Sequence, residues 1–206
     1  LVQRDEEIKE TFNDAFSSNA PINNIILVLD KSRSMAAENK MSRLKASIIK
    51  LIYALREQDQ ITVLTYSRVV KIPISSNHNA SKSELVQVVN DLKADGGSYG
   101  NKAMTEAFEI ARKSRVRDGN NAIILATDGK FNDRDFSEED LYKEAKRASR
   151  YGISLSGIAF GEDPRALDFL KILSESGGGT YVEVESQMDS DQMIIDMINT
   201  LSKNVQ

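Results

Sequence analysis

Residues 26–35 read ILVLDKSRSM, and the fold can be worked out from this stretch. The aliphatic run Ile25 to Leu29 is short and has polar residues on both sides, which is typical of a strand buried on both faces. The run stops at Asp30, and two hydroxyls, Ser32 and Ser34, follow at alternate positions. The sequence therefore places a carboxylate and two hydroxyls directly after a buried strand.

The rest of the chain alternates between strand and helix patterns. Apolar residues at helical spacing predict helices, and short apolar runs predict strands. Pro73 restricts the segment 69–74 to a sheet edge, because proline cannot donate a ladder hydrogen bond. The predicted strands are 25–29, 61–67, 69–74, 121–127, 153–160 and 180–184, and the predicted helices are 40–57, 81–92, 103–113, 137–152, 163–176 and 193–201.

This alternation predicts an α/β fold with a doubly wound, mostly parallel central sheet of Rossmann-like form. Helices flank the sheet, and one short antiparallel strand lies at its edge. Residues 1–21 carry a weak helical stripe of Ile8, Phe12 and Phe16, so we expect an N-terminal arm or helix there. Residues 22–206 are predicted to form one domain, which suits the chain length of 206 residues.

Composition excludes several classes of function. The net charge of −4 does not suit a nucleic-acid partner. No apolar stretch approaches the roughly 20 residues that span a bilayer, so we expect no direct membrane insertion. Cysteine is absent, which rules out disulfides and thiolate chemistry. The sequence leaves the oligomeric state open.

Three loops offer side-chain oxygens that could bind a metal ion. They are residues 30–34, 96–98 and 127–129, and the ligands of a doubly wound sheet bind near such loops, where the strand order reverses. Among their side chains are the carboxylates of Asp30 and Asp128 and the hydroxyls of Ser32, Ser34 and Ser98. Such hard oxygens suit Mg²⁺, Ca²⁺ or Mn²⁺. Zn²⁺ prefers His and Cys side chains, and this chain has one His and no Cys.

The three loops in this order resemble those of a von Willebrand factor A-type domain. The resemblance rests on Asp-x-Ser-x-Ser at 30–34, the glycine-rich loop at 96–101 and Thr-Asp-Gly at 127–129, and it covers residues 22–203. The stretch ILATDGKFN at 124–132 is most similar to the bacterial branch, which is often found on cell-envelope proteins. The resemblance thus favours an extracytoplasmic location, in the periplasm or at the cell surface, with the cytoplasm as the alternative.

In that family the loops form a metal-ion-dependent adhesion site (MIDAS). The resemblance implies that Ser32 and Ser34 bind the cation through their hydroxyls. Asp30 and Asp128 are expected to act mostly through bound waters or from behind the direct ligands. The second loop usually supplies a threonine, and Ser98 stands in that place here, with its neighbour Tyr99 as the alternative.

This resemblance implies a divalent-cation-dependent protein–protein interaction or adhesion module with no catalysis. We expect Mg²⁺, with Ca²⁺ or Mn²⁺ as alternatives. Neutral hydroxyls leave the cation electrophilic, so an Asp or Glu of a protein partner can complete its coordination. Lys31 and Arg33 flank the site and add attraction for an acidic partner.

Two other functions remain open from the sequence. One is a cytoplasmic subunit of the same family that docks on an ATPase. The other is a phosphatase-like α/β enzyme with Asp30 as nucleophile. A second Asp two residues after Asp30 is missing, no phosphate-binding glycine motif follows the first strand, and the single histidine, His78, lies in a distant polar loop. These features disfavour the enzyme.

Overall fold

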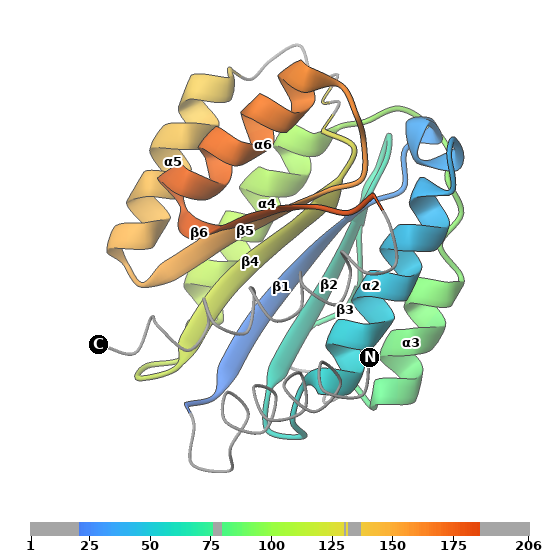
Figure 1. Ribbon diagram of the computed structural model, residues 1–206. Helices are drawn as coiled ribbons and strands as arrows, with labels where there is room; N and C mark the ends of the chain where they lie inside the picture. Colours follow the sequence, from blue (N-terminus) through green and yellow to red (C-terminus); the bar gives the residue numbers. More distant parts are fainter. Residues whose placement is uncertain (1–20, 76–79, 130, 132–136, 186–206) are drawn as a thin grey trace, which may run out of the picture.

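The computed structural model describes residues 21–75, 80–129, 131 and 137–185. Its described part contains a six-stranded sheet in the order β3-β2-β1-β4-β5-β6 (Figure 1). β3 is antiparallel to β2, and every other neighbouring pair is parallel. The strands are β1 (Asn23–Asp30), β2 (Gln60–Tyr66), β3 (Val70–Ile74), β4 (Asn120–Thr127), β5 (Ile153–Ala159) and β6 (Gly178–Glu183).

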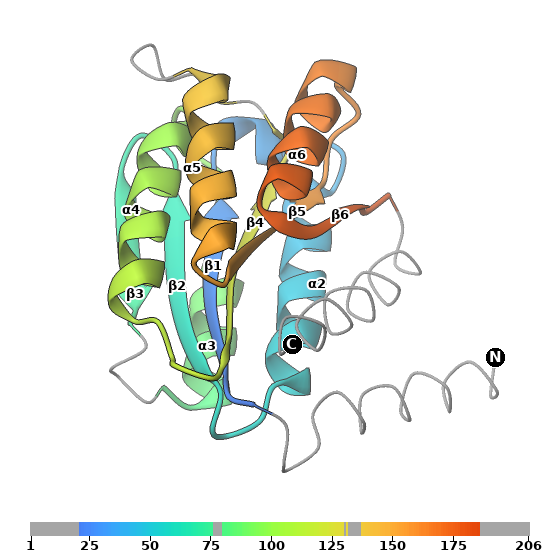
Figure 2. The same cartoon turned by 90° about the vertical axis from the view of Figure 1, so that its left-hand side faces the viewer.

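Helices cover both faces of this sheet, as predicted (Figures 1 and 2). α2 and α3 pack on one face, and α4, α5 and α6 pack on the other. The helices are α2 (Lys40–Ala54), α3 (Lys82–Asn90), α4 (Gly100–Lys113), α5 (Glu138–Arg150) and α6 (Pro164–Ser176), with a short 3₁₀ helix η1 (Arg33–Ala36) after β1. In the described ranges, no helix has both the length and the apolar character that crossing a bilayer requires.

The central strand β1 divides its side chains between two cores. Ile25, Leu27 and Leu29 pack with α2 and α3, whereas Ile26 and Val28 pack with α4, α5 and α6. All five side chains are fully buried. The prediction of a strand buried on both faces is therefore confirmed, and the uninterrupted aliphatic run follows from this double burial.

Several local signals act as their residue types predict. Ser81 and Glu84 form a reciprocal capping box at the start of α3, and Asp163 caps α6 with Pro164 at its first position. Some boundaries differ from the prediction. α4 begins at Gly100 rather than Ala103, and η1 was not predicted. The predicted helix 193–201 and nearly all of the predicted N-terminal arm lie outside the described residues.

A buried asparagine, Asn121, connects the start of β4 to the loop that precedes this strand. Its Nδ2 donates to the carbonyls of Val116 and Gly119 at 2.9 and 3.1 Å. Its Oδ1 accepts from the backbone N–H of Val116 at 2.8 Å and from Asn24 Nδ2 at 3.0 Å. One side chain thus satisfies backbone groups that have no strand partner, and it links β4 to β1.

We expect Asn121→Ala to destabilise the fold by about 2 kcal/mol, because it leaves several buried polar groups unsatisfied. Urea unfolding followed by circular dichroism measures the loss. The matched control is Asn90→Ala, at the exposed end of α3, which should stay within about 0.5 kcal/mol of the wild-type protein. Equal stabilities for the two variants would contradict the assigned role.

Candidate metal centre

The candidate site lies where the chain leaves β1 and β4, at the carboxyl ends of the parallel strands. After β1 the chain builds β2 and β3 on one side, and it later returns to β4 on the other side (Figure 1). The strand order therefore reverses between β1 and β4, as a ligand site in such a sheet requires. Asp30 ends β1 and Thr127 ends β4, so both lie at this position.

Asp30 is fully buried, at 0% exposure, and its carboxylate is held by three donors. Oδ1 accepts the backbone N–H of Ser32 at 2.7 Å, and Oδ2 accepts the hydroxyls of Thr127 at 2.6 Å and Tyr66 at 3.0 Å. Burial raises the pKa of the Asp30 carboxyl above its ordinary value, and the hydrogen bonds from Thr127 and Ser32 oppose that effect. Asp30 therefore acts as a fixed acceptor around which the loops are built.

The first loop brings two hydroxyls together. Ser32 Oγ and Ser34 Oγ lie 3.0 Å apart, Ser32 is buried and Ser34 is half-buried. Two contacts hold this loop in place. The Asp30 carboxylate accepts from Ser32 in a turn, and Met35 of η1 inserts into the core beneath α2.

The second loop is joined to the first by backbone hydrogen bonds. Arg33 N–H donates to Gly96 O at 3.2 Å, and Asp95 N–H donates to Lys31 O at 2.7 Å. These bonds bring the segment that holds Ser98 beside the two serines of the first loop.

The two candidates of the second loop differ in their surroundings. Ser98 is 2% exposed, and its Oγ has no hydrogen-bond partner among the described residues. The Tyr99 side chain is 41% exposed, and the backbone N–H of Tyr99 donates to Ser67 O at 2.9 Å. Of these two candidates, Ser98 is the one with a buried oxygen that has no hydrogen bond among the described residues.

The third loop carries the least satisfied carboxylate of the site. Asp128 is buried, and neither carboxylate oxygen accepts a hydrogen bond from the described residues. The Lys40 ammonium lies 3.7 Å from Asp128 Oδ2. The loop turns at Gly129, whose φ of +82° belongs to the left-handed region that glycine adopts readily.

These donors fit a small divalent cation. Buried polar atoms normally have hydrogen bonds, and three oxygens here have none in the part of the chain that the structure describes: Ser98 Oγ and both carboxylate oxygens of Asp128. No group of three or more His, Cys, Asp or Glu side chains that could hold a metal ion converges within the described ranges. A cation here would meet two carboxylates and otherwise neutral hydroxyls, the donor set of a hard metal.

Three further residues belong to the site and were not among the predicted ligands. Tyr66 and Thr127 donate to Asp30, and Lys40 faces Asp128. Tyr66 is the register partner of Asp30 on β2, and burial together with the nearby Asp30 charge raises its pKa well above its ordinary value. Thr127 stood next to a predicted ligand in the sequence, but the contacts of Tyr66 and Lys40 depend on strand register and loop path.

Phe131 packs against Tyr66, one of the residues that donate to Asp30. Its ring meets Tyr66 edge-on, with centroids 6.0 Å apart and an interplanar angle of 87°, and it packs in a similar way on Phe169. A Cβ on Gly100 would come within 2.2 Å of this ring, so the first residue of α4 has to be glycine for Phe131 to fit. Phe131 therefore packs on the same tyrosine whose hydroxyl donates to the Asp30 carboxylate.

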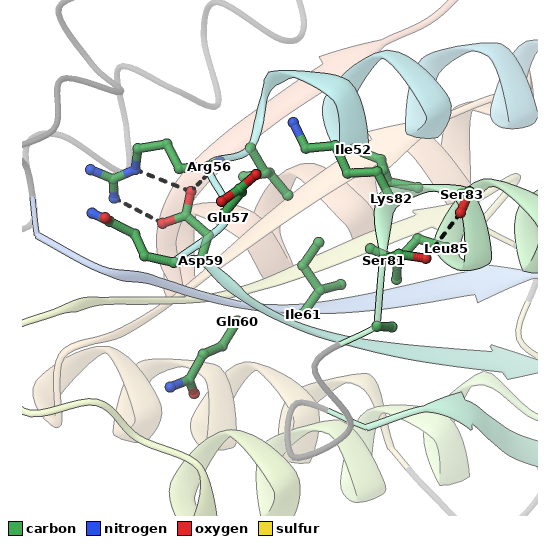
Figure 3. A pocket seen from close by; sticks show the side chains of 13 residues that line it. Ile52, Arg56, Glu57, Asp59, Gln60, Ile61, Ser81, Lys82, Ser83 and Leu85 are labelled. Carbon is green, nitrogen blue, oxygen red and sulfur yellow. Dashed lines mark hydrogen bonds and ion pairs between the residues drawn. The ribbon is translucent and has the colours of Figure 1, made fainter.

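A separate pocket of about 760 Å³ lies at the opposite end of the sheet (Figure 3). It is lined by the end of α2, the start of β2 and the start of α3. Arg56 pairs with Asp59 at 2.8 Å, and Ser81 caps α3, so these polar groups already have partners. The pocket therefore holds no evident catalytic set, and the predicted ligands all lie elsewhere.

Comparison with known proteins gives several relatives of similar sequence. The uncharacterized protein YfbK of Escherichia coli (strain K12) is 26% identical over 196 residues, and the match covers 93% of this chain and 34% of YfbK. The Synechocystis protein sll0103 is 26% identical over 167 residues, covering 81% of this chain and 39% of that protein. The chain thus spans less than half of the length of these relatives.

Solved structures share the fold. A von Willebrand factor type A protein from Catenulispora acidiphila superposes with a TM-score of 0.71 at 19% identity, covering 90% of this chain and 43% of that one. BatB from Bacteroides thetaiotaomicron gives a TM-score of 0.67 at 20% identity, covering 88% and 99%. Proximal thread matrix protein 1 from the mussel byssus, in a structure with a zinc-occupied MIDAS motif, gives 0.67 at 16% identity, covering 86% and 46%.

The model of one family accounts for most of the chain. The von Willebrand factor type A domain matches residues 24–195, which include all three loops of the candidate site. Its members are generally interaction modules, and at least one of the structural neighbours holds a divalent metal at its MIDAS motif. This chain therefore belongs to the von Willebrand factor type A domain family.

Proposed function

We propose that this domain is a divalent-cation-dependent protein–protein interaction or adhesion module without catalytic activity. Three loops hold the cation through Asp30, Ser32, Ser34, Ser98 and Asp128. Mg²⁺ is the proposed ion, with Ca²⁺ and Mn²⁺ as alternatives. The observation that carries the proposal is the group of three buried oxygens, Ser98 Oγ and both oxygens of Asp128, that lack hydrogen bonds among the described residues.

The side chains of the three loops would have different roles. Ser32, Ser34 and Ser98 offer neutral hydroxyls, so the protein neutralises the cation with two carboxylates only. Asp30 is occupied by three hydrogen bonds and serves mainly to position the loops. When bound, the cation would supply a positive charge, and an Asp or Glu of a partner could complete its coordination. Lys31 and the exposed Arg33 add attraction for that acidic partner.

Thermal unfolding tests the metal site directly. A ligand that binds only the folded state stabilises it by about 2.7 kcal/mol at one hundred times its Kd. For a domain of this size we expect Mg²⁺ to raise Tm by roughly 5–10 °C relative to EDTA. Ca²⁺, Mn²⁺ and Zn²⁺ should be compared in parallel, because a solved relative holds zinc at such a motif. Identical melting curves in EDTA and in 10 mM of each cation would refute the proposed site.

The partner is tested by reversible capture. Proteins retained by the immobilised domain in Mg²⁺ should elute in EDTA, and the same proteins should pass over an Asp128→Ala domain. Esterification of the carboxyl groups of an eluted partner should abolish its rebinding, since the proposed contact needs a carboxylate. Retention that survives both EDTA and the variant would contradict a metal-dependent interaction.

We further propose that the interaction takes place outside the cytoplasm, in the periplasm or at the cell surface. The support is the similarity to the bacterial members of the family. Fractionation of cells that express the full-length protein tests this location. Recovery of the protein in the cytoplasmic fraction together with an ATPase would favour the alternative function as an ATPase-docking subunit.

A further inference from the structure

A lysine ammonium lies inside the site, beside the least satisfied carboxylate. Lys40 opens α2, its side chain is only 10% exposed, and its Nζ lies 3.7 Å from Asp128 Oδ2. The same Nζ lies 3.6 Å from Oε2 of Glu38, whose side chain is 62% exposed. Lysine is almost never buried unless it is paired. Lys40 therefore has one buried and one exposed carboxylate within reach.

The backbone before α2 is shaped to bring Lys40 to this position. Glu38 and Asn39 have φ angles of 52° and 58°, in the left-handed region that residues other than glycine seldom adopt. The backbone N–H of Lys40 donates to Ala37 O at 3.0 Å and closes the turn. This turn directs the first side chain of α2 toward the third loop.

The charges of Lys40 and of a bound cation determine how this lysine affects cation binding. A divalent cation held by Asp128 would bring two positive charges close to the Lys40 ammonium. Repulsion between like charges is strong where water is excluded, because the effective dielectric constant is low. Lys40 and the cation therefore compete for the same carboxylate.

We propose that Lys40 is an internal competitor for the divalent cation. In the metal-free protein it neutralises Asp128 and stabilises the empty loops. When the cation binds, the ammonium moves away from Asp128 and keeps Glu38, which already lies 3.6 Å away, as its remaining partner. The lysine thus sets the cation affinity below the value that the loop oxygens alone would give. This inference rests on the proposed function, because it requires the cation to bind at Asp128.

The first experiment compares the full 206-residue chain with Lys40→Met, using isothermal titration with Mg²⁺ and Mn²⁺. We expect about tenfold tighter binding in the variant, since the competing charge is removed and the alkyl stem is kept. In EDTA the variant should melt several degrees lower, because Asp128 loses its buried counter-ion. The matched control is Lys102→Met, which removes an exposed charge from the first turn of α4 and should change neither quantity.

The second experiment uses Glu38→Gln, an exposed change that leaves the core intact. It removes the alternative partner of Lys40, so Mg²⁺ should bind about threefold more weakly. Glu162→Gln, an exposed acid in the loop after β5, controls for the general loss of negative charge. In the Lys40→Met background the effect of Glu38→Gln should vanish, because a double-mutant cycle isolates the pair.

The outcomes separate the inference from the proposed function. Wild-type binding of Mg²⁺ with equal or weaker binding by Lys40→Met overturns the competitor and leaves the metal site standing. Absence of cation binding in both the wild-type protein and the variant overturns the metal site itself. If Lys40→Met does not fold, Glu38→Gln decides alone, and binding equal to that of Glu162→Gln overturns the competitor.

Discussion

Asp128→Ala is expected to weaken Mg²⁺ binding by at least about 100-fold while leaving the metal-free protein as stable as the wild type or slightly more stable. The carboxylate is buried, accepts no hydrogen bond from the described residues and, in the absence of a cation, is balanced by the Lys40 ammonium at 3.7 Å, so its desolvation offsets most of the stability that the ion pair contributes. Lys40 keeps a second partner in Glu38 after the substitution. A residue can therefore be essential for binding and dispensable for folding.

Titration calorimetry with Mg²⁺ measures the loss of affinity, and urea unfolding in EDTA measures the stability of the metal-free protein. Asp95→Ala is the matched control, because Asp95 is an exposed acid directly before the second loop and alanine keeps the backbone N–H that donates to Lys31 O. The control should bind Mg²⁺ within about twofold of the wild-type affinity. A large loss of stability for Asp128→Ala in EDTA would show that the residue is structural.

Gly129→Ala is expected to destabilise the domain by about 3 kcal/mol, through backbone strain and overpacking together. The φ of +82° at Gly129 strains any residue with a Cβ. A Cβ there would also lie 2.6 Å from Ala166 Cβ and 3.0 Å from the Ala166 carbonyl oxygen of α6. The carbonyl belongs to a helix backbone, so it cannot move aside cheaply.

Urea unfolding measures this loss, and Gly97→Ala provides the control. A Cβ on Gly97 would meet only Arg68 Cγ, at the ordinary distance of 3.5 Å, and the expected change is within about 0.5 kcal/mol. Because Gly129 follows Asp128 directly, the loss of stability should come with weaker Mg²⁺ binding. A Gly129→Ala protein with wild-type stability would mean that the loop adopts another path.

The sequence predicted the parts of the fold that local chemistry controls. The aliphatic run at 25–29 predicted a central strand, because such a run needs burial on both faces of the sheet. Pro73 predicted an edge strand, and β3 lies at one edge of the sheet. Helix starts at Ser81 and Asp163 followed from capping chemistry. The predicted strand 180–184 begins two residues too late, because Gly178 and Gly179 belong to β6, where a Cβ on Gly179 would lie 2.1 Å from Leu155 O.

The candidate site was predictable only in part, for a physical reason. Asp30, Ser32 and Asp128 follow strands whose pattern is visible in the sequence. The partners of these residues come from across the sheet or from the next helix. Tyr66 meets Asp30 because of the register between β1 and β2, and Lys40 meets Asp128 because of two left-handed residues before α2. Neither feature has a local sequence signal.

The parallel ladder between β1 and β4 runs from the pair Asn23 and Asn120 to the pair Leu29 and Ala126, directly beneath the loops. A partner that pulls on these loops along the strand direction loads this ladder lengthwise. All of its hydrogen bonds then share the force at once, instead of opening one after another as in a zipper. If the proposed function holds, we therefore expect the domain to resist unfolding when a partner pulls on these loops along the strand direction.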